Sequence, residues 1–354
     1  MISKLTLKNF RCFQDFTLEG IRSVTLIAGA NNVGKSTILD GVFLFSDRQS
    51  SDVFFKLNGF RGIHQLTLSP TMVWEPLFMN MNTENSIVIR IDNDGQTQTA
   101  TISKDDSLFS LSSILETPLS QNAKGIGMPV FNSYPLKLNY EDSATNDVSH
   151  FILTEMGLTL MPQKPIATKI PYVQYLSSKI SLTSTQLAEY FGKIDITGER
   201  AKCVEVLQLL EPRIKDLSVI VIGGISGIYA DIGLPSRLSV NMLGDGTNKL
   251  MHIALTMLSN PGSIVLIDEI ENGFHYSFFP KLWEIVGKLA KDTKCQVFAT
   301  THSYECIQGA LTIAVDETDM FRFIRLDQID GAVTPHLFEN DSFKYAVENE
   351  WEVR

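Results

Sequence analysis

The sequence predicts an α/β fold in which a mixed sheet carries helices on both faces and a lobe rich in antiparallel strands is inserted. Three observations support this fold class. An apolar strand pattern at Val24–Ala28 leads through a glycine-rich turn into a helix pattern at Ser36–Phe45. Strand and helix patterns alternate again in the last third, which is typical of parallel sheets. Between these regions, the turn Asn93-Asp94-Gly95 joins two strand patterns and is a strong hairpin signal.

The expected strands are recognised by alternation or by short apolar runs. Alternating residues predict a strand at Ile2–Leu7, and the short apolar run at Val24–Ala28 predicts a buried parallel strand. Further strands are expected at Ser86–Asp92, Thr97–Ser103, Leu217–Ile222, Gly227–Ile232, Ile264–Ile267 and Cys295–Thr301, the middle pair being a second hairpin about Gly223-Gly224.

The expected helices are segments in which apolar residues recur with a period near 3.6. They are Ser36–Phe45, Thr185–Phe191, Gly198–Leu210, Asn248–Leu258 and Phe279–Leu289, and Pro212 follows the end of the third. Gln121–Asn146 is rich in Gly, Pro, Ser and Asn, and this composition predicts a loop or mobile insertion. No heptad pattern long enough for a coiled coil occurs.

Composition is that of an ordinary globular chain of 354 residues, with 44% hydrophobic and 20% charged residues. Four cysteines without a CxxC pair indicate reduced thiols and no disulfide framework. The net charge of -10 argues against a uniformly basic coat for nucleic acid but permits a local phosphate site. Neither a signal-peptide pattern nor a membrane-spanning apolar run is present, so a cytoplasmic protein without membrane association is expected.

The turn at residues 29–36, Gly-Ala-Asn-Asn-Val-Gly-Lys-Ser, fits the phosphate-binding pattern G-x-x-x-x-G-K-[ST]. Its glycines allow backbone N–H groups to surround phosphates at a helix N-terminus. Lys35 is expected to reach the β- and γ-phosphates and Ser36 to ligate Mg²⁺. The nucleotide-binding residues expected in this loop are Asn31, Asn32, Gly34, Lys35, Ser36 and Thr37.

Two further polar positions follow apolar strands of the last third. Asp268 and Glu269 end the strand at Ile264–Ile267, and His302 follows the strand at Cys295–Thr301. Because carboxyl ends of parallel strands meet at one edge of a sheet, these side chains are expected near the phosphate loop. Asp268 is the expected second Mg²⁺ ligand, Glu269 is placed to orient or deprotonate the attacking water, and His302 has a γ-phosphate role.

A second glycine loop, Leu243-Gly244-Asp245-Gly246-Thr247, opens the helix at Asn248–Leu258. It is either an ordinary turn or a second anion site formed by backbone N–H groups and the positive helix end. One chain with two phosphate cradles suggests that this second loop is supplied in trans by another subunit.

In this order, the motifs resemble those of ABC-type ATPases: the phosphate loop with Asn-Asn, Leu-Gly-Asp-Gly, Asp-Glu-Ile-Glu-Asn-Gly-Phe-His and Thr-Thr-His-Ser. The chain is most similar to stand-alone prokaryotic AAA/ABC ATPases related to the overcoming-lysogenisation-defect (OLD) and RecF/SMC proteins. Asn9–Phe13 also resembles their first strand and turn. Because Lys35 and Asp268 must meet, one interrupted ATPase domain is expected over residues 1–354, with an insertion at about 75–215.

The resemblance implies ATP and Mg²⁺ as ligands and Gly244 and Gly246 as the signature loop, completing the partner subunit's site in a homodimeric ATP sandwich. It also implies that Glu271–His275 is the D-loop and His302 the switch histidine. The sequence departs from the family pattern at Gly244, where a serine is usual. For the Q-loop glutamine, Gln174 is the candidate.

The leading functional hypothesis is an ATP-hydrolysing switch, with Lys35, Glu269 and His302 as catalytic residues, that controls a partner protein or DNA. A transporter subunit, a structural-maintenance protein and a fused OLD nuclease each lack a required segment, and no Asn-Lys-x-Asp motif indicates a GTPase. A separate nuclease or toxin effector in an anti-phage defence system is therefore expected.

The alternative is a RecF-like DNA-binding repair ATPase, for which six basic residues would form a strip: Lys179, Lys193, Arg200, Lys202, Arg213 and Lys215. For these residues we favour the other interpretation, a solvated helix face.

Overall fold

A computed structural model describes residues 1–63, 67–105, 134–154, 157–161, 172–317, 319–329, 331–349 and 351–353. The chain forms two compact units, and each is built from separate pieces of sequence. Unit 1 comprises Met1–Gly20, Ser36–Ile170 and Gln328–Pro335, and unit 2 comprises Ile21–Lys35, Pro171–Asp327 and His336–Arg354. That residues 1–354 act as one interrupted domain stays a prediction.

Unit 1 is an antiparallel sheet with strand order β2-β1-β4-β5-β6-β7-β8. The strands are β1 (Ile2–Phe10), β2 (Phe13–Leu18), β4 (Ile87–Asn93), β5 (Gln96–Lys104), β6 (Leu136–Glu141), β7 (Asn146–Thr154) and β8 (Gly157–Met161). The strand at Ile2–Leu7 and the hairpin about Asn93-Asp94-Gly95 are thereby confirmed.

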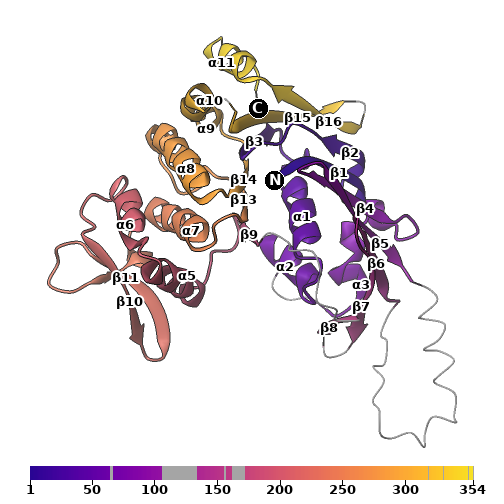
Figure 1. Ribbon diagram of the computed structural model, residues 1–354, viewed down its shortest axis with the longest axis horizontal. Coiled ribbons are helices and arrows are strands. Elements are labelled where there is room, and N and C mark those ends of the chain that lie inside the picture. Colours follow the sequence, from indigo (N-terminus) through magenta and orange to yellow (C-terminus); the bar gives the residue numbers. More distant parts are fainter. Residues whose placement is uncertain are drawn as a thin grey trace, which may run out of the picture. The chain divides into compact units, whose positions relative to one another are not determined.

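Helices α1 (Lys35–Ser46), α2 (Val53–Phe60) and α3 (Pro70–Val73) lie on one side of this sheet (Figure 1). Gly41 of α1 is needed there, because a Cβ at this position would lie 2.7 Å from the Leu7 side chain of β1. Aromatic pairs fix the helices further: Phe54 and Phe151 have ring centroids 4.7 Å apart. Two 3-10 turns, η1 (Glu75–Leu77) and η2 (Met79–Met81), follow α3.

The expected loop at Gln121–Asn146 is only partly testable, because residues 121–133 lie outside the described residues. Where the structure does describe it, the prediction is wrong: Leu136–Glu141 forms β6, paired with β5 and β7. The strand alternates buried Leu136, Leu138 and Tyr140 with more exposed polar residues. The composition of the longer window conceals this two-residue period.

The main sheet of unit 2 has the order β16-β15-β3-β14-β13-β9. The strands are β3 (Val24–Gly29), β9 (Val173–Leu176), β13 (Ile264–Ile267), β14 (Gln296–Thr300), β15 (Phe321–Ile329) and β16 (Ala332–Phe338). The pairs β9/β13, β13/β14, β14/β3 and β3/β15 are parallel. This confirms the parallel sheet expected from the strands at Val24–Ala28, Ile264–Ile267 and Cys295–Thr301, whereas β9 and β15 were not predicted. The carboxyl ends of β3, β13 and β14 therefore share one edge.

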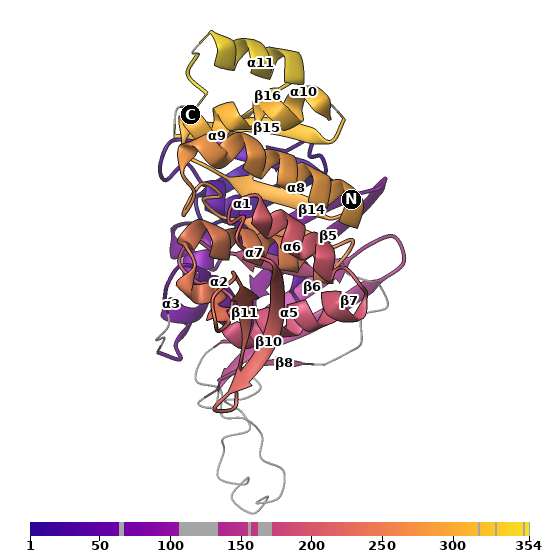
Figure 2. The same cartoon turned by 90° about the vertical axis from the view of Figure 1, so that its left-hand side faces the viewer.

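Five helices of unit 2 accompany this sheet: α7 (Asp245–Ser259), α8 (Phe279–Thr293), α9 (Tyr304–Gly309), α10 (Leu311–Asp316) and α11 (Asn340–Glu348). Figures 1 and 2 show α7 and α8 side by side along the sheet. They bury a continuous apolar core with the strands, in which Leu250, Trp283 and Val297 are fully enclosed. The predicted helices at Asn248–Leu258 and Phe279–Leu289 are confirmed.

A side layer of unit 2 contains α5 (Ser184–Ile196), α6 (Arg200–Gln208), β10 (Asp216–Ile222), β11 (Ile225–Asp231), β12 (Leu238–Ser239) and η4 (Val240–Met242). The strands form a sheet of order β10-β11-β12. The predicted helices and the hairpin about Gly223-Gly224 are confirmed, and α5 begins at a capping box in which Thr183 and Gln186 exchange hydrogen bonds.

Candidate functional site

The glycine loop lies between β3 and α1 and has the backbone that a phosphate cradle requires. Gly29, Asn32 and Gly34 have φ angles of 143°, 64° and 104°. A Cβ at Gly29 would lie 2.5 Å from the carbonyl oxygen of Leu326 on β15, so only glycine fits beside that strand. The tight packing of β3 against β15 fixes where the loop begins. The positive φ angles allow the N–H groups of the loop to turn inward, as a phosphate cradle requires.

Lys35 ends this loop and opens α1. Its Nζ donates to the carbonyl oxygens of Gly29 (2.6 Å) and Ala30 (2.9 Å), so the ammonium lies over the loop itself. Burial lowers the pKa of Lys35, while the carboxylates of Glu271, Asp268 and Glu269 act against that shift. A cation over a glycine loop with carboxylates around it is suited to phosphate and a bound divalent ion.

Asp268 and Glu269 follow β13 and are joined through one hydroxyl of the neighbouring strand. Thr300 Oγ1 at the end of β14 donates to Asp268 Oδ1 at 2.7 Å and accepts from the Glu269 N–H at 2.9 Å. The Asp268 N–H donates in turn to the carbonyl of Leu176 on β9. The carboxylate of Asp268 is 8% exposed, so its position at the sheet edge is fixed by buried bonds.

Glu269 is held in a left-handed backbone conformation, with φ of 51°. Such a conformation is uncommon for a residue other than glycine and persists only where its surroundings impose it. Its carbonyl oxygen accepts from Lys249 Nζ at 2.5 Å and from the Asn272 N–H at 3.1 Å. Asn272 Nδ2 also donates to Glu269 Oε2 at 2.6 Å. The carboxylate is therefore aimed by contacts to both its backbone and its side chain.

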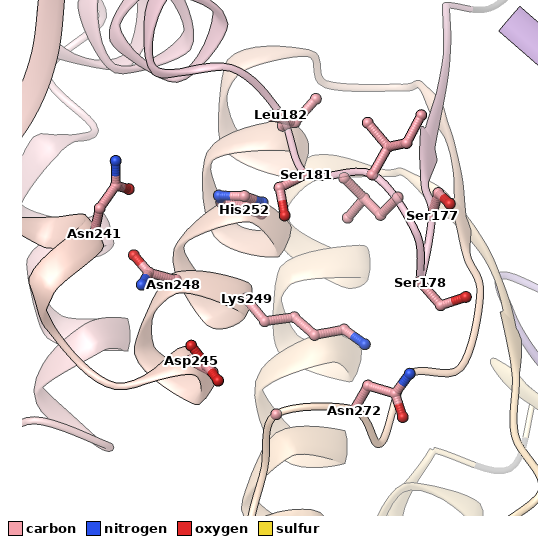
Figure 3. Close-up of a pocket in the computed structure, with 13 residues that line it drawn as sticks. Ser177, Ser178, Ser181, Leu182, Asn241, Asp245, Asn248, Lys249, His252 and Asn272 are labelled. Carbon is pink, nitrogen blue, oxygen red and sulfur yellow. The ribbon is translucent and has the colours of Figure 1, made fainter. Parts of the chain in front are cut away.

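Lys249 is a candidate site residue that the sequence did not indicate. It lies on α7, where its side chain extends from the helix toward Ser178 and Asn272 (Figure 3). Burial lowers its pKa to about 8, although Glu271, Glu269 and Asp268 favour the charged form. Through this half-buried lysine, which donates to the Glu269 carbonyl, α7 is connected to the segment that follows β13.

His302 and Glu271 form the next contact at this edge. The His302 N–H and its ring Nδ1 both lie 3.0 Å from Glu271 Oε1. An ionised carboxylate can only accept, so the facing Nδ1 carries a proton and Nε2 is left for an external group. Glu271 is 8% exposed, and its Oε2 has no hydrogen-bond partner among the described residues. Glu271 fixes the orientation of the histidine.

The glycine loop expected to be the signature loop packs against the segment expected to be the D-loop of the same chain. Gly244 is the N-cap of α7 and has open space where a side chain would project. At Gly246, in contrast, a Cβ would lie 2.8 Å from the Gly273 carbonyl oxygen. Gly246 is therefore required for close packing on the D-loop, whereas the absence of a side chain at Gly244 has no such steric reason.

A pocket of about 500 Å³ lies beside the first two turns of α7 (Figure 3). His252 and Asn248 line it from the helix, and Ser177, Ser178 and Ser181 line it from the segment after β9. Burial and the nearby Lys249 lower the pKa of His252 to about 4, so the imidazole is neutral at physiological pH.

The structure brings Asp268, Glu269 and His302 together at one sheet edge of unit 2. The carboxylates of Asp268 and Glu269 also favour the charged form of Lys35. Asn31, Asn32 and Gly34 lie in the loop of that unit, and Ser36 and Thr37 follow Lys35 in the first turn of α1. The structure does not test what these side chains bind.

Gln174, the Q-loop candidate, is the second residue of β9 and pairs with Val265 inside the sheet. Its Oε1 accepts from the hydroxyls of Tyr172 and Tyr190, at 3.0 and 2.8 Å. The polar residues that follow β9 at the edge of Asp268 are serines, of which Ser177 and Ser178 line the pocket.

The six basic residues of the expected strip are largely neutralised. Four of them form ion pairs with carboxylates, namely Lys193 with Glu189, Arg200 with Asp216, Lys202 with Glu199 and Arg213 with Glu211. This pairing favours the solvated-face interpretation over a DNA-binding strip.

A parallel sheet that ends in a phosphate loop, an Asp-Glu pair and a carboxylate-bound histidine has the architecture of a P-loop ATPase of the ABC type. Comparison with known families agrees: residues 1–151 match the family described as "AAA ATPase domain". Residues 224–307 match "AAA domain, putative AbiEii toxin, Type IV TA system". The first match contains the phosphate loop, and the second contains the signature loop, Asp268, Glu269 and His302.

A curated relative, the "ATP/GTP phosphatase" of Helicobacter pylori (strain ATCC 700392 / 26695), is 24% identical over 379 residues, which cover 99% of each chain. Among solved structures, an SMC head bound to the C-winged helix domain of ScpA shares the fold, with a TM-score of 0.52. It is 12% identical, and the match covers 96% of this chain and 97% of that one. Two regions of the chain therefore match AAA ATPase families, and its fold is that of an ABC-type P-loop ATPase. None of the helices in its described part is long and apolar enough to span a bilayer.

Proposed function

We propose that this chain binds Mg-ATP and hydrolyses it as a dimeric switch. The observation that carries the proposal is the connected set at the sheet edge, in which Thr300 joins Asp268 to Glu269, while Lys35 Nζ lies over the glycine loop and the same carboxylates favour its charged form, against the effect of burial on its pKa. Lys35 would bind the β- and γ-phosphates, and the backbone of Asn31, Asn32 and Gly34 would surround them. Thr37, in the first turn of α1, would also contact the nucleotide.

The donor set suits magnesium. Mg²⁺ prefers hard oxygen ligands and takes most of its coordination sphere from phosphate and water, so an all-protein cage is not needed. In the described part of the chain, no cluster of three or more His, Cys, Asp or Glu side chains is arranged to hold a metal ion. Ser36 and Asp268 are the proposed protein ligands, and the bound ion would neutralise developing charge on the phosphates.

Glu269 is the proposed general base. Its carboxylate would accept a proton from water while the water oxygen attacks the γ-phosphorus and the bond to the ADP oxygen breaks. Asn272 and Lys249 keep the carboxylate in place, which reduces the reorganisation required during reaction. His302, fixed by Glu271, would donate from Nε2 to the γ-phosphate when its ring carries both protons.

The switch itself is the proposed closure of two chains around nucleotide, with Gly244 and Gly246 of one chain facing the phosphate loop of the other. The N-cap at Gly244 supports this role, because it is exposed and no side chain caps the positive end of α7 there. Hydrolysis and phosphate release would open the pair and pass the change to a partner.

The substitution Glu269→Gln tests the function, since it keeps the side-chain shape and removes the base. We expect hydrolysis to fall by roughly 10²–10⁴-fold, and light scattering to show a mass increase with ATP that ADP does not produce. The control is Lys35→Ala, which is expected to lose nucleotide binding. Unchanged mass on adding ATP to the glutamine variant would refute the sandwich, and undiminished hydrolysis would refute the role of Glu269.

We further propose that the partner is a separate nuclease or toxin of an anti-phage defence system in the cytoplasm. The description of the second family as a putative AbiEii toxin of a toxin–antitoxin system supports this context. The test is co-expression of the chain with the proteins of its neighbouring genes. Retention of a nuclease or toxin by the Glu269→Gln variant with ATP, and loss of retention with Lys35→Ala, is expected. Salt-sensitive DNA binding without such a partner would contradict this proposal.

A further inference from the structure

The hairpin of β10 and β11 has an open edge. In its three-stranded sheet the order is β10-β11-β12, so among the described residues β10 has a strand on one side only. The hairpin reaches past the end of α5 in both views (Figures 1 and 2). An edge strand presents a row of N–H and C=O groups that another strand can pair with.

The turn geometry determines which groups lie on that edge. Gly223 and Gly224 have φ angles of 59° and 80°, as in the two-residue hairpin turn whose flanking residues, Ile222 and Ile225, form a hydrogen-bonded pair. Alternation then directs the backbone groups of Val219 and Val221 away from β11.

An independent contact gives the same assignment. Leu217, Val219 and Val221 are alternate residues of β10, so their backbone groups face the same edge. The carbonyl oxygen of Leu217 accepts from Nη2 of Arg200, a residue of α6, at 2.5 Å. Farther along this edge, none of the described residues provides a backbone partner for Val219 or Val221. The outer edge is therefore occupied at Leu217 and open at the next two outward residues.

The open part of the edge is also apolar. Val221, Ile222 and Ile225 are 64%, 60% and 68% exposed. Two other edge strands carry residues that discourage pairing: β16 contains Pro335, and β2 contains Asp15, whereas β8 and β9 contain neither a charge nor a proline. From Leu217 to Ile222, β10 has neither a charge nor a proline.

We propose that this edge pairs with the same edge of a second copy of the chain. A two-fold axis at Ile220 places Ile220 opposite Ile220 of the second copy and Val219 opposite its Val221. Both of these facing residues direct their backbone groups outward, so they can exchange N–H···O bonds as a hydrogen-bonded antiparallel pair. The nearest charged residue, Asp216, falls opposite Gly224 of the second copy, so no like charges meet.

This interface differs from the proposed ATP sandwich because it contains no nucleotide-binding residue. Its strength should not depend on nucleotide, and the two associations can fail independently. In this register Val219, Ile220 and Val221 face Val221, Ile220 and Val219 of the second copy, so the centre of the edge is complementary to itself. A foreign strand would not need this match.

The test measures mass against concentration without nucleotide, by analytical ultracentrifugation over roughly 1–100 μM, the range of a weak interface. Two variants, Ile220→Lys and Ile220→Glu, each place like charges opposite each other and should weaken self-association by at least about tenfold. A mixture of the two should associate again, because opposite charges then face each other. Ile196→Lys, at an 89% exposed position on α5, is the matched control and should associate like the unaltered chain.

Far-UV circular dichroism and nucleotide binding of each variant show that the fold is kept. The proposal is refuted if the unaltered chain stays monomeric through this range. It is also refuted if the Ile220 variants associate as strongly as the control, or if the mixture fails to associate. Capture of a foreign strand by a monomeric chain would likewise overturn pairing between copies.

Discussion

Replacing Lys249 with methionine should separate catalysis from stability. The substitution keeps the aliphatic stem on α7 and removes the ammonium that donates to the Glu269 carbonyl. A hydrogen bond from a charged donor is worth about 1.5–3 kcal/mol, and one factor of ten in rate corresponds to about 1.4 kcal/mol. If this bond is needed to hold Glu269 for proton transfer, kcat should fall by about 10- to 100-fold. KM for ATP should change little, because Lys249 is separate from the phosphate loop.

Stability should not fall with the rate. Burial lowers the pKa of Lys249 from 10.5 to about 8, which corresponds to a cost of about 3 kcal/mol for keeping the charge at neutral pH. Loss of the hydrogen bond costs about 1 kcal/mol, since the Asn272 N–H still satisfies the Glu269 carbonyl. The free energy of unfolding of the methionine variant should therefore equal or exceed that of the unaltered chain at pH 7.

The pH dependence has a defined sign. Between pH 8 and 10.5 the unfolded chain keeps a proton on Lys249 that the folded chain has released, so stability rises with pH in the unaltered chain. The methionine variant lacks this rise of about 3 kcal/mol.

Steady-state kinetics and urea unfolding measure these quantities, with Lys249→Arg as the control that restores a donor and part of the rate. A methionine variant with unaltered kcat would refute the positioning role. A parallel loss of kcat and stability would show that Lys249 acts only in folding.

Two further predictions concern the same helix. Because burial lowers the pKa of His252 to about 4, the unfolded chain binds the additional proton as pH falls from 6.5, and stability is lost over that range. His252→Gln should remove about 3 kcal/mol of this acid sensitivity in urea unfolding between pH 6.5 and 4, and equal sensitivity would contradict the neutral imidazole. Gly246→Ala should cost about 1–3 kcal/mol and lower ATPase activity, because its Cβ meets a carbonyl oxygen at 2.8 Å. Gly244→Ala, with open space, should cost no more than about 1 kcal/mol in the same thermal unfolding experiment, and equal costs would contradict this steric reasoning.

Features encoded within a short stretch of sequence were predictable. The glycine loop between Val24–Ala28 and Ser36–Phe45 was recognisable because strand, turn and helix signals adjoin there, and the turn about Asp94-Gly95 fixed a hairpin locally. In β6, the alternating residues were obscured by the composition around them. The ladder partners of β6–β8 and of β15–β16 are set by the whole sheet, which no local window contains.

The candidate site divides in the same way. Asp268, Glu269 and His302 were predictable because each follows an apolar strand, and parallel strands place such residues at one edge. Lys249 was not, because a lysine on an amphipathic helix resembles any solvent-facing lysine until tertiary packing brings it to Glu269. Thr300 likewise forms part of the site only through β14 lying beside β13.

The pairing of β3 has a consequence for how the protein is made. Val24 and its neighbours pair with β14 on one side and with β15 on the other, strands that begin at Gln296 and Phe321. The strand that leads into the phosphate loop therefore leaves the ribosome long before either neighbour exists. Such non-local pairing delays folding until the strands that begin at Gln296 and Phe321 are synthesised. Until then, the four apolar residues at 24 and 26–28 have no partner strands, and nascent or truncated chains should lack a formed phosphate loop and depend on protection from aggregation.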